Sequence, residues 1–171
     1  MDRMTRRRFL GATGTAGVAG LAGCGNTSSD KAKLIDAGMR VGLDVWLDSD
    51  EVGGKASNYD GKILDARNNK SFTVKVGAEG NGGNLAFDPV ALLVSRGTTV
   101  KWEWTGKGGA HNVVAEPVPY VDSVDTITFN SGNPQETRED PFTVTRAGAA
   151  TAMYRCENHL DAGMKGSVLW R

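Results

Sequence analysis

Histidine and cysteine are scarce in this sequence of 171 residues, because each occurs only twice. Two cysteines exclude a scaffold held together by several disulfides, and they exclude a zinc site built from four cysteines. Neither sign of charge is in excess, since 20 Lys and Arg residues balance 20 Asp and Glu residues. This balance argues against a protein that binds nucleic acid, which usually carries a basic excess. The scarce residues leave material for one small metal centre at most.

Glycine, by contrast, is abundant, with 23 residues. Such a content predicts turns and loops rather than long helices. A hydrophobic content of 39% is compatible with a packed core, and the chain is long enough for one domain but hardly for two.

The first 23 residues have the features of an export signal. Thr5–Leu10 resembles the twin-arginine export motif, and a weakly apolar stretch, Phe9–Gly23, overlaps and follows it. That stretch is too short and too mild for a membrane span, which needs about 20 apolar residues. It ends in Leu21–Cys24, which resembles a lipobox, where the cysteine takes a lipid and becomes the first mature residue. We therefore predict a twin-arginine lipoprotein signal peptide at residues 1–23 and lipid attachment at Cys24, with a plain signal or an uncleaved N-terminal anchor as the alternative.

The signal holds four arginines and one aspartate, so the remaining chain has 16 basic and 19 acidic residues, a net charge of −3. Residues 24–43 are predicted to be a tether, because Gly25–Lys33 is small and polar. Leu34–Leu47 mixes apolar and polar residues and is compatible with a short helix packed on the domain edge. The folded domain is expected over residues 44–171.

From residue 71 onward the pattern is that of β-strands. Apolar and polar residues alternate in Ser71–Val76 and again in Val100–Trp104. Further short runs with strand character are Leu85–Phe87, Ala91–Val94, Asn112–Ala115, Thr126–Phe129, Phe142–Thr145, Thr151–Cys156 and Gly166–Trp170. Many short strands separated by turn residues predict an all-β fold, an antiparallel β-sandwich with one apolar face of each strand turned inward.

Two glycine-rich stretches, Gly77–Asn84 and Gly106–Gly109, invite comparison with phosphate-binding loops. The first lacks the GxGxxG spacing, no helical pattern follows it, and no P-loop Lys-Ser or Lys-Thr pair is present. We interpret the first as a long turn between strands and the second as a hairpin loop that leads into His111.

Residues that can bind a metal gather in the last quarter of the chain, where Cys156, His159 and Met164 have the spacing C-x2-H-x4-M. A strand end followed by a tight loop can turn all three side chains toward one point. A fourth ligand must come from elsewhere, and His111 is the only other histidine. Two imidazoles and a thiolate with a weak axial thioether are the ligands of a blue-copper electron-transfer centre.

Each of these residues has an ordinary structural alternative. A lone cysteine is usually a small core residue, a lone histidine is usually hydrogen-bonded, and Met164 could simply pack in the core. The combination favours a metal centre, because both histidines and the only cysteine outside the lipobox belong to one constellation. Met153 lies inside a strand and is interpreted as a core residue.

The order of His111 and Asn112, followed by Cys156, His159 and Met164, resembles plastocyanin-type cupredoxins. The flanking sequence resembles halocyanins more closely, over roughly residues 44–171, in these segments: Trp46, Asn58–Gly61, Val76–Asn84, Phe87–Pro89 and Thr98–Gly106. The resemblance implies a Greek-key β-sandwich of about eight strands, one type 1 copper per chain, and one-electron transfer at the outer face of the cytoplasmic membrane.

Carried over to this sequence, the resemblance makes His111, Cys156 and His159 the strong ligands and Met164 the weak axial ligand. It implies that Asn112 links the two ligand-bearing loops.

The resemblance also implies an electron port. His159 would expose one ring edge to the partner, and Leu160, Ala162 and Gly163 would form an apolar docking patch around it. The expected partners are redox proteins of the respiratory membrane, of the cytochrome-complex or terminal-oxidase class. The protein is expected to be a monomer held at the membrane by its lipid and not to bind nucleic acid.

Two departures from the family pattern stand out. Asn158 precedes the second histidine, where family members often have proline, and residues 131–140 look like a polar insertion between strands.

The sequence is compatible with three hypotheses about function. The first is an electron carrier rather than an enzyme, and the second is a copper storage or delivery protein with the same ligands. The third is a hydrolase with Cys156 as nucleophile and His111 or His159 as base.

Overall fold

The structure is a computed structural model that describes residues 27–117 and 125–171, with side chains from residue 38 onward. The predicted signal peptide at residues 1–23 and Cys24 lie outside the described residues. One helix, α1 (Thr27–Asp48), precedes the strands. The strands are β1 (Leu64–Asp65), β2 (Ser71–Gly80), β3 (Gly83–Asp88), β4 (Ala91–Val94), β5 (Thr99–Trp104), β6 (Val114–Ala115), β7 (Phe129–Asn130), β8 (Phe142–Thr145), β9 (Ala150–Arg155) and β10 (Lys165–Trp170).

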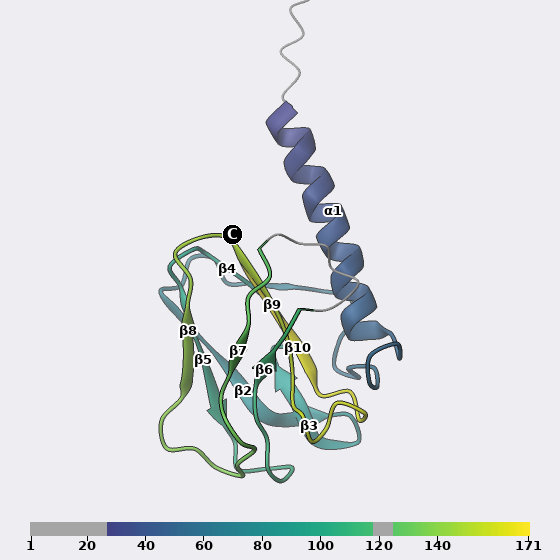
Figure 1. The fold of residues 1–171 in the computed structure, drawn as a ribbon, viewed down its shortest axis with the longest axis vertical. Coiled ribbons are helices and arrows are strands. Elements are labelled where there is room, and N and C mark those ends of the chain that lie inside the picture. Colours follow the sequence, from purple (N-terminus) through teal and green to yellow (C-terminus); the bar gives the residue numbers. More distant parts are fainter. Residues whose placement is uncertain (1–26, 118–124) are drawn as a thin grey trace, which may run out of the picture.

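The strands form two sheets, with the orders β1-β4-β10-β9-β6-β7 and β3-β2-β5-β8. The predicted β-sandwich is confirmed (Figure 1). The described part of the chain has ten strands instead of about eight. Nine of them overlap the runs with strand character in the sequence, and only the two-residue strand β1 was not predicted. The sequence predicted antiparallel pairing throughout, but three pairs are parallel: β2 with β5, β4 with β1, and β4 with β10. Parallel partners cannot be joined by a tight hairpin, so the chain crosses between the sheets.

The main core fills the space between the sheets. Its centre is Trp102 on β5, whose ring lies 5.4 Å from that of Tyr154 and 5.2 Å from that of Phe129. Cys156 and Met164 belong to the same buried cluster. Two of the predicted metal ligands are therefore part of the hydrophobic core.

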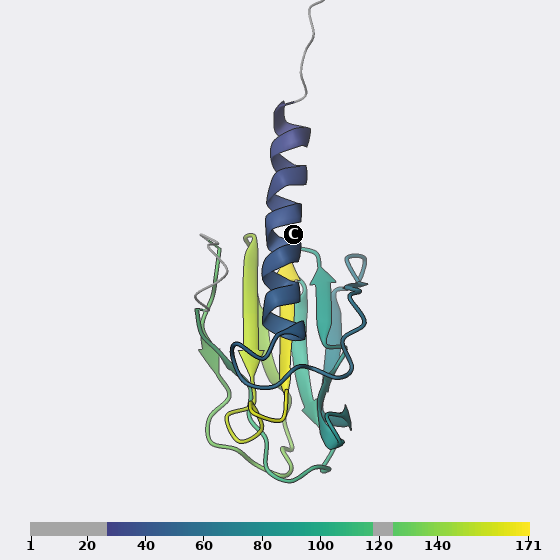
Figure 2. The same cartoon turned by 90° about the vertical axis from the view of Figure 1, so that its right-hand side faces the viewer.

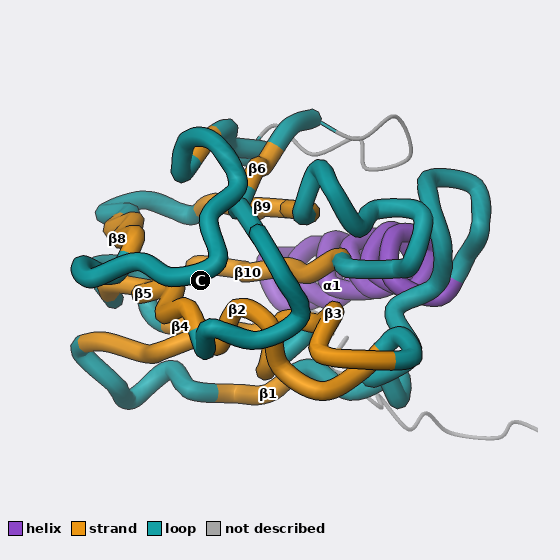
Figure 3. Tube along the Cα trace, turned by 90° about the horizontal axis from the view of Figure 1, so that it is seen from below, coloured by secondary structure: helices purple, strands orange, loops and turns teal. Residues whose placement is uncertain are grey.

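Helix α1 covers the outer face of the β9–β10 pair (Figure 3). On these strands the inward residues join the main core, while Met153 and Leu169, which point outward, pack with Leu43 and Leu47 of α1 in a second cluster. The interpretation of Met153 as a core residue is confirmed. Because both faces of the two strands are buried, apolar residues stand at consecutive positions, Ala152–Tyr154 on β9 and Val168–Trp170 on β10, instead of alternating with polar ones.

The helix changes the domain boundary expected at residue 44. The segment predicted to be a tether is helical from Thr27, and Met39 and Leu43 are buried against the sandwich, so the packed part begins before residue 44. The helix predicted within Leu34–Leu47 is confirmed and is longer than expected. Among the described residues, no helix has both the length and the hydropathy that a membrane-spanning segment needs.

Gly77–Asn84 is not the long turn that its glycines suggested. Strand β2 continues to Gly80 and β3 begins at Gly83, so only Asn81 and Gly82 form the turn. Both turn residues have positive φ, 55° and 79°, which is typical of tight hairpins. Gly77, with φ of 82°, sits at a bulge in the pairing of β2 with β3. These glycines therefore allow the turn and the bulge of the β2–β3 hairpin, which lies at the edge of its sheet.

Candidate metal centre

Two loops at one end of the sandwich bring the predicted ligands together. His111 lies on the connection between β5 and β6, and the ligand loop, Cys156–Met164, joins β9 to β10. Figures 1 and 2 show this end pointing away from the projecting part of α1 and from the C-terminus.

The three strong ligand candidates face one another with their metal-binding atoms. His111 Nδ1 lies 3.1 Å from His159 Nδ1, and Cys156 Sγ lies 3.8 Å from the former and 3.5 Å from the latter. Metal–nitrogen and metal–sulfur bonds in proteins are about 2.0 and 2.3 Å long, so atoms at these separations can share one ion. The donor set of two imidazoles and a thiolate fits copper.

The second nitrogen of His111 fixes its tautomer. His111 Nε2 lies 2.9 Å from the carbonyl oxygen of Lys107, so it carries the proton and donates it, which leaves Nδ1 free to bind a metal. Gly108 (φ of 82°) passes so close that a Cβ there would lie 2.1 Å from the Asn84 carbonyl oxygen and 3.0 Å from His111 Nε2. The glycine-rich loop before His111 therefore allows its backbone to pass beside the imidazole.

Residues 131–140, expected to be a polar insertion, lie along the His111 loop. The backbone N–H of His111 donates to the Gln135 carbonyl, and the Gln135 N–H donates to the His111 carbonyl, both at 2.9 Å. The same His111 carbonyl accepts a bond from Trp104 Nε1 at 3.0 Å. Arg138 lies over the Trp104 ring at 5.6 Å and donates to the Ser131 carbonyl. The sequence did not reveal this support, because backbone pairing carries no side-chain signature.

The ligand loop is closed by its own backbone. Cys156 N–H donates to the Met164 carbonyl at 3.0 Å, and Met164 N–H donates to the His159 carbonyl at 3.0 Å. Met164 and Cys156 are fully buried, and His111 is 1% exposed, whereas His159 is only half-buried. His159 is thus the ligand candidate nearest to solvent.

Burial shifts the protonation equilibria of the three groups toward their neutral forms. It lowers the pKa of His111, against the opposing hydrogen bond to Lys107, and it lowers the pKa of His159. Burial raises the pKa of the Cys156 thiol, although backbone amides of Asn112, Asn158 and His159 oppose this. Neutral imidazoles are ready to bind a metal, while the thiol must lose its proton on binding, so uptake of a metal releases a proton.

Asn112 joins the two ligand-bearing loops. Its Nδ2 donates to Glu157 Oε2 at 2.6 Å and to the Gly132 carbonyl at 3.1 Å, and its Oδ1 accepts a bond from the Glu157 N–H at 2.9 Å. Asn112 is fully buried, but Gly132 and Glu157 are exposed, so the three bonds are only partly shielded from water. The side chain therefore holds His111 and Cys156 at a fixed separation through their immediate neighbours.

Replacing Asn112 with alanine is expected to lower the free energy of unfolding by about 3 kcal/mol, because three bonds are lost and the backbone groups of Gly132 and Glu157 lose partners. Urea unfolding of the metal-free protein measures this loss. The exposed Asn133 gives the matched control, for which we expect a change within about 0.5 kcal/mol. Equal losses in both variants would contradict the linking role of Asn112.

The predicted docking patch is only partly exposed. Ala162 is exposed and Leu160 is half-buried, but Gly163 is buried. A Cβ at Gly163 would lie 1.9 Å from the Lys55 carbonyl oxygen, so this residue faces the protein and cannot line a docking surface. The assignment of Gly163 to the patch is corrected on this ground.

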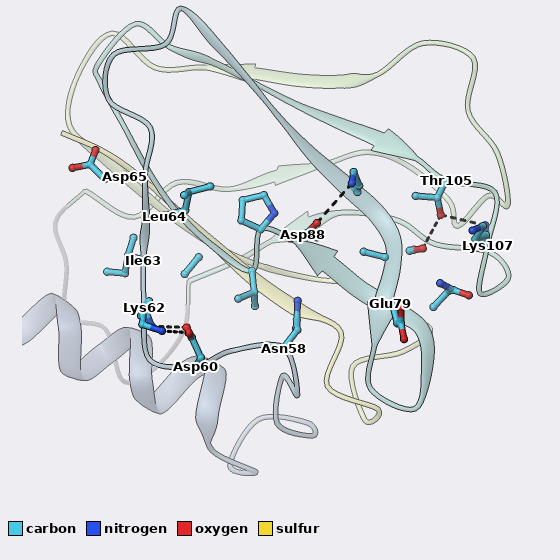
Figure 4. A pocket seen from close by; sticks show the side chains of 17 residues that line it. Asn58, Asp60, Lys62, Ile63, Leu64, Asp65, Glu79, Asp88, Thr105 and Lys107 are labelled. Carbon is cyan, nitrogen blue, oxygen red and sulfur yellow. Dashed lines mark hydrogen bonds and ion pairs between the residues drawn. The ribbon is translucent and has the colours of Figure 1, made fainter.

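A groove of about 1000 Å³ lies beside the centre, between residues 58–65 and the β2–β3 edge (Figure 4). Its charges are largely balanced, since Asp60 pairs with Lys62 and Lys75 with Asp88. The three ligand candidates do not line it. The chemistry therefore belongs to the buried cluster and not to the groove.

Comparison with known proteins points to one family. A family model for copper-binding proteins of the plastocyanin/azurin family matches residues 72–170. The chain is 37% identical to a halocyanin from Natronomonas pharaonis over 174 residues, covering 99% of both chains. It is 32% identical to a plastocyanin from Daucus carota over 95 residues, covering 56% of this chain and 95% of the plastocyanin. A pseudoazurin structure from Sinorhizobium meliltoi aligns with a TM-score of 0.45 at 21% identity, covering 63% of this chain and 75% of that chain.

Proposed function

The chain belongs to the plastocyanin/azurin family of copper-binding proteins, and from this premise we propose that it is a one-electron carrier with a single type 1 copper site. The observation that carries the proposal is the close approach of His111 Nδ1, His159 Nδ1 and Cys156 Sγ, the first and third of which belong to buried residues. Met164, in the same core cluster, is the proposed weak axial ligand. When bound, copper supplies the exchangeable electron by alternating between Cu(II) and Cu(I).

The residues of the chain contribute rigidity to this exchange. His111 is fixed through Nε2 and its backbone, and Asn112 ties its loop to that of Cys156. Ligands held in this way shift little between the two oxidation states, which keeps the reorganisation cost of electron transfer low. Burial of Cys156 excludes water from the thiolate, and the exposed part of His159 provides the route to the partner.

The hydrolase alternative has little support from this geometry. Cys156 is fully buried, and burial raises the pKa of its thiol, whereas a nucleophilic cysteine needs a lowered pKa and access to substrate. A copper storage or delivery protein would use the same ligands but would release the metal readily.

Electron exchange is expected to occur around His159. Replacing the exposed Ala162 with glutamate is expected to change the second-order rate of exchange with a membrane redox partner by at least a factor of about 10, because a charge three residues from the port alters docking. Stopped-flow kinetics with cytochrome-complex and terminal-oxidase preparations measure the rate. The same change at the exposed Ala147, on the β8–β9 turn at the other end of the sandwich, is the control and leaves the rate unchanged. Equal rates for both variants would contradict this port.

We also propose that the protein acts at the outer face of the cytoplasmic membrane, anchored through a lipid on Cys24. Support comes from the twin-arginine and lipobox patterns in Thr5–Leu10 and Leu21–Cys24. Replacing Cys24 with serine is expected to move the protein from the membrane to the soluble fraction, while Ser28→Ala leaves it at the membrane. Mass spectrometry of the native N-terminus provides the direct test, and an unmodified Cys24 would overturn the proposal.

A further inference from the structure

We propose that Trp46–Lys55, which lies outside the region matched by the family model, is a clamp that positions the ligand loop and with it Met164. The inference rests on the proposed copper function, since it assigns these residues a role in shaping the copper site. The clamp consists of the end of α1 and the loop that follows it, and it contacts the ligand loop and the start of β10.

On one side of Met164, the clamp approaches the ligand loop backbone to backbone. Gly54 N–H donates to the Leu160 carbonyl at 3.0 Å. A Cβ at Gly54 would lie 2.4 Å from the Asp161 carbonyl oxygen, and one at Gly53, whose φ is 68°, would lie 2.5 Å from the Leu160 carbonyl oxygen. Real Cβ atoms essentially never come this close to other atoms. Glycine is therefore required on the clamp, as it is at Gly163 on the ligand loop.

On the other side of Met164, the clamp holds a buried charge. Lys165, only 1% exposed, donates through Nζ to the carbonyls of Ser49 and Val52, both at 3.1 Å. Its ammonium lies 5.2 Å from the centre of the Trp46 ring, and Trp46 Nε1 donates to the Gly166 carbonyl at 3.0 Å. A buried ammonium tolerates few positions, because it must keep its hydrogen-bond partners. The contacts thus fix the start of β10 directly after Met164.

Both flanks of Met164 are therefore held by one segment, at Leu160–Gly163 before it and at Lys165–Gly166 after it. The weak axial ligand of a blue-copper site tunes its potential, so a segment that sets the position of this ligand also sets the electronic properties of the site. The clamp also covers the side of the loop that carries Gly163, which leaves the side of His159 for a partner.

The test compares three copper-loaded variants with the unaltered protein. Gly54→Ala places a Cβ against the ligand loop, Trp46→Phe removes the bond to Gly166 and keeps an aromatic ring over Lys165, and Gly38→Ala is the control. Gly38 lies on the same helix, and a Cβ there would meet nothing within 4 Å. We expect the first two variants to shift the reduction potential and the Cu(II) EPR spectrum and to slow electron self-exchange severalfold. We expect Gly38→Ala to match the unaltered protein.

A second readout does not depend on copper. In the metal-free protein, the Met164 methyl resonance is expected to shift in Gly54→Ala and in Trp46→Phe and to stay in place in Gly38→Ala. If Gly54→Ala does not fold, Trp46→Phe, the milder change, decides.

The outcomes separate the two proposals. An unaltered protein that binds copper without blue colour would overturn the proposed function. The clamp would be overturned if the unaltered protein is blue and the variants Gly54→Ala and Trp46→Phe unfold at a lower temperature but keep its reduction potential, EPR spectrum and Met164 resonance. The contacts of the clamp would then contribute to stability alone.

Discussion

Replacing Cys156 with serine abolishes the intense blue absorption of the copper-loaded protein, the largest effect we expect from any single substitution. The colour of a blue-copper site arises from charge transfer between the thiolate and Cu(II), and Cys156 is the one free cysteine among the described residues. Serine keeps the size of the side chain and removes the sulfur. Visible absorption and EPR at equal copper content provide the measurement.

Met153→Leu is the matched control for this substitution. Met153 also carries sulfur and is buried on β9, but it points into the second cluster, away from the metal centre. We expect it to keep the blue colour. A Cys156→Ser protein that remained blue would show that the thiolate is not a ligand.

Replacing Gly163 with alanine is expected to lower the free energy of unfolding by about 3 kcal/mol or more, an unusually large effect for adding one methyl group. The residue has φ of 94°, which disfavours any side chain, and the new Cβ would lie 1.9 Å from the Lys55 carbonyl oxygen. The ligand loop and the clamp would have to separate. Denaturant unfolding of the metal-free protein measures the loss.

Gly82→Ala separates the two causes of this loss. Gly82 also has positive φ, 79°, but a Cβ there would meet nothing within 4 Å. It should cost only about 1 kcal/mol, the penalty of the backbone conformation alone. If both variants lost the same free energy of unfolding, the close contact between Gly163 and Lys55 would not contribute to the loss in Gly163→Ala.

The sequence predicted best what depends on side-chain type and local spacing. Cys156, His159 and Met164 lie within nine residues, and His111 was found because the chain has only two histidines. The alternation of Val100, Trp102 and Trp104 correctly placed β5. Side chains with distinctive chemistry or a regular period leave a signal in the amino-acid sequence itself.

Contacts made by the backbone left no such signal. Backbone N–H and carbonyl groups make the pairing of Gln135 with His111 and the contact of Gly54 with Leu160. Residues of every type except proline have both groups, so these contacts do not depend on a particular side chain. For the same reason Gly163 was assigned to an exposed patch, since its sequence does not reveal the carbonyl of Lys55 packed against it. Parallel strand pairing was missed because the residue pattern of a short strand does not show which strand lies beside it or in which direction that neighbour runs.

Reversible redox cycling of the purified protein tests the central claim most directly. The protein is loaded with Cu(II), reduced, reoxidised, and assayed for colour and for metal lost to a Cu(I) chelator. We predict one copper per chain, one electron per cycle, and full return of the blue band with the metal retained. Transfer of the copper to the chelator on reduction, or a copper-loaded protein without the blue band, would contradict an electron carrier, and the former would favour copper storage or delivery.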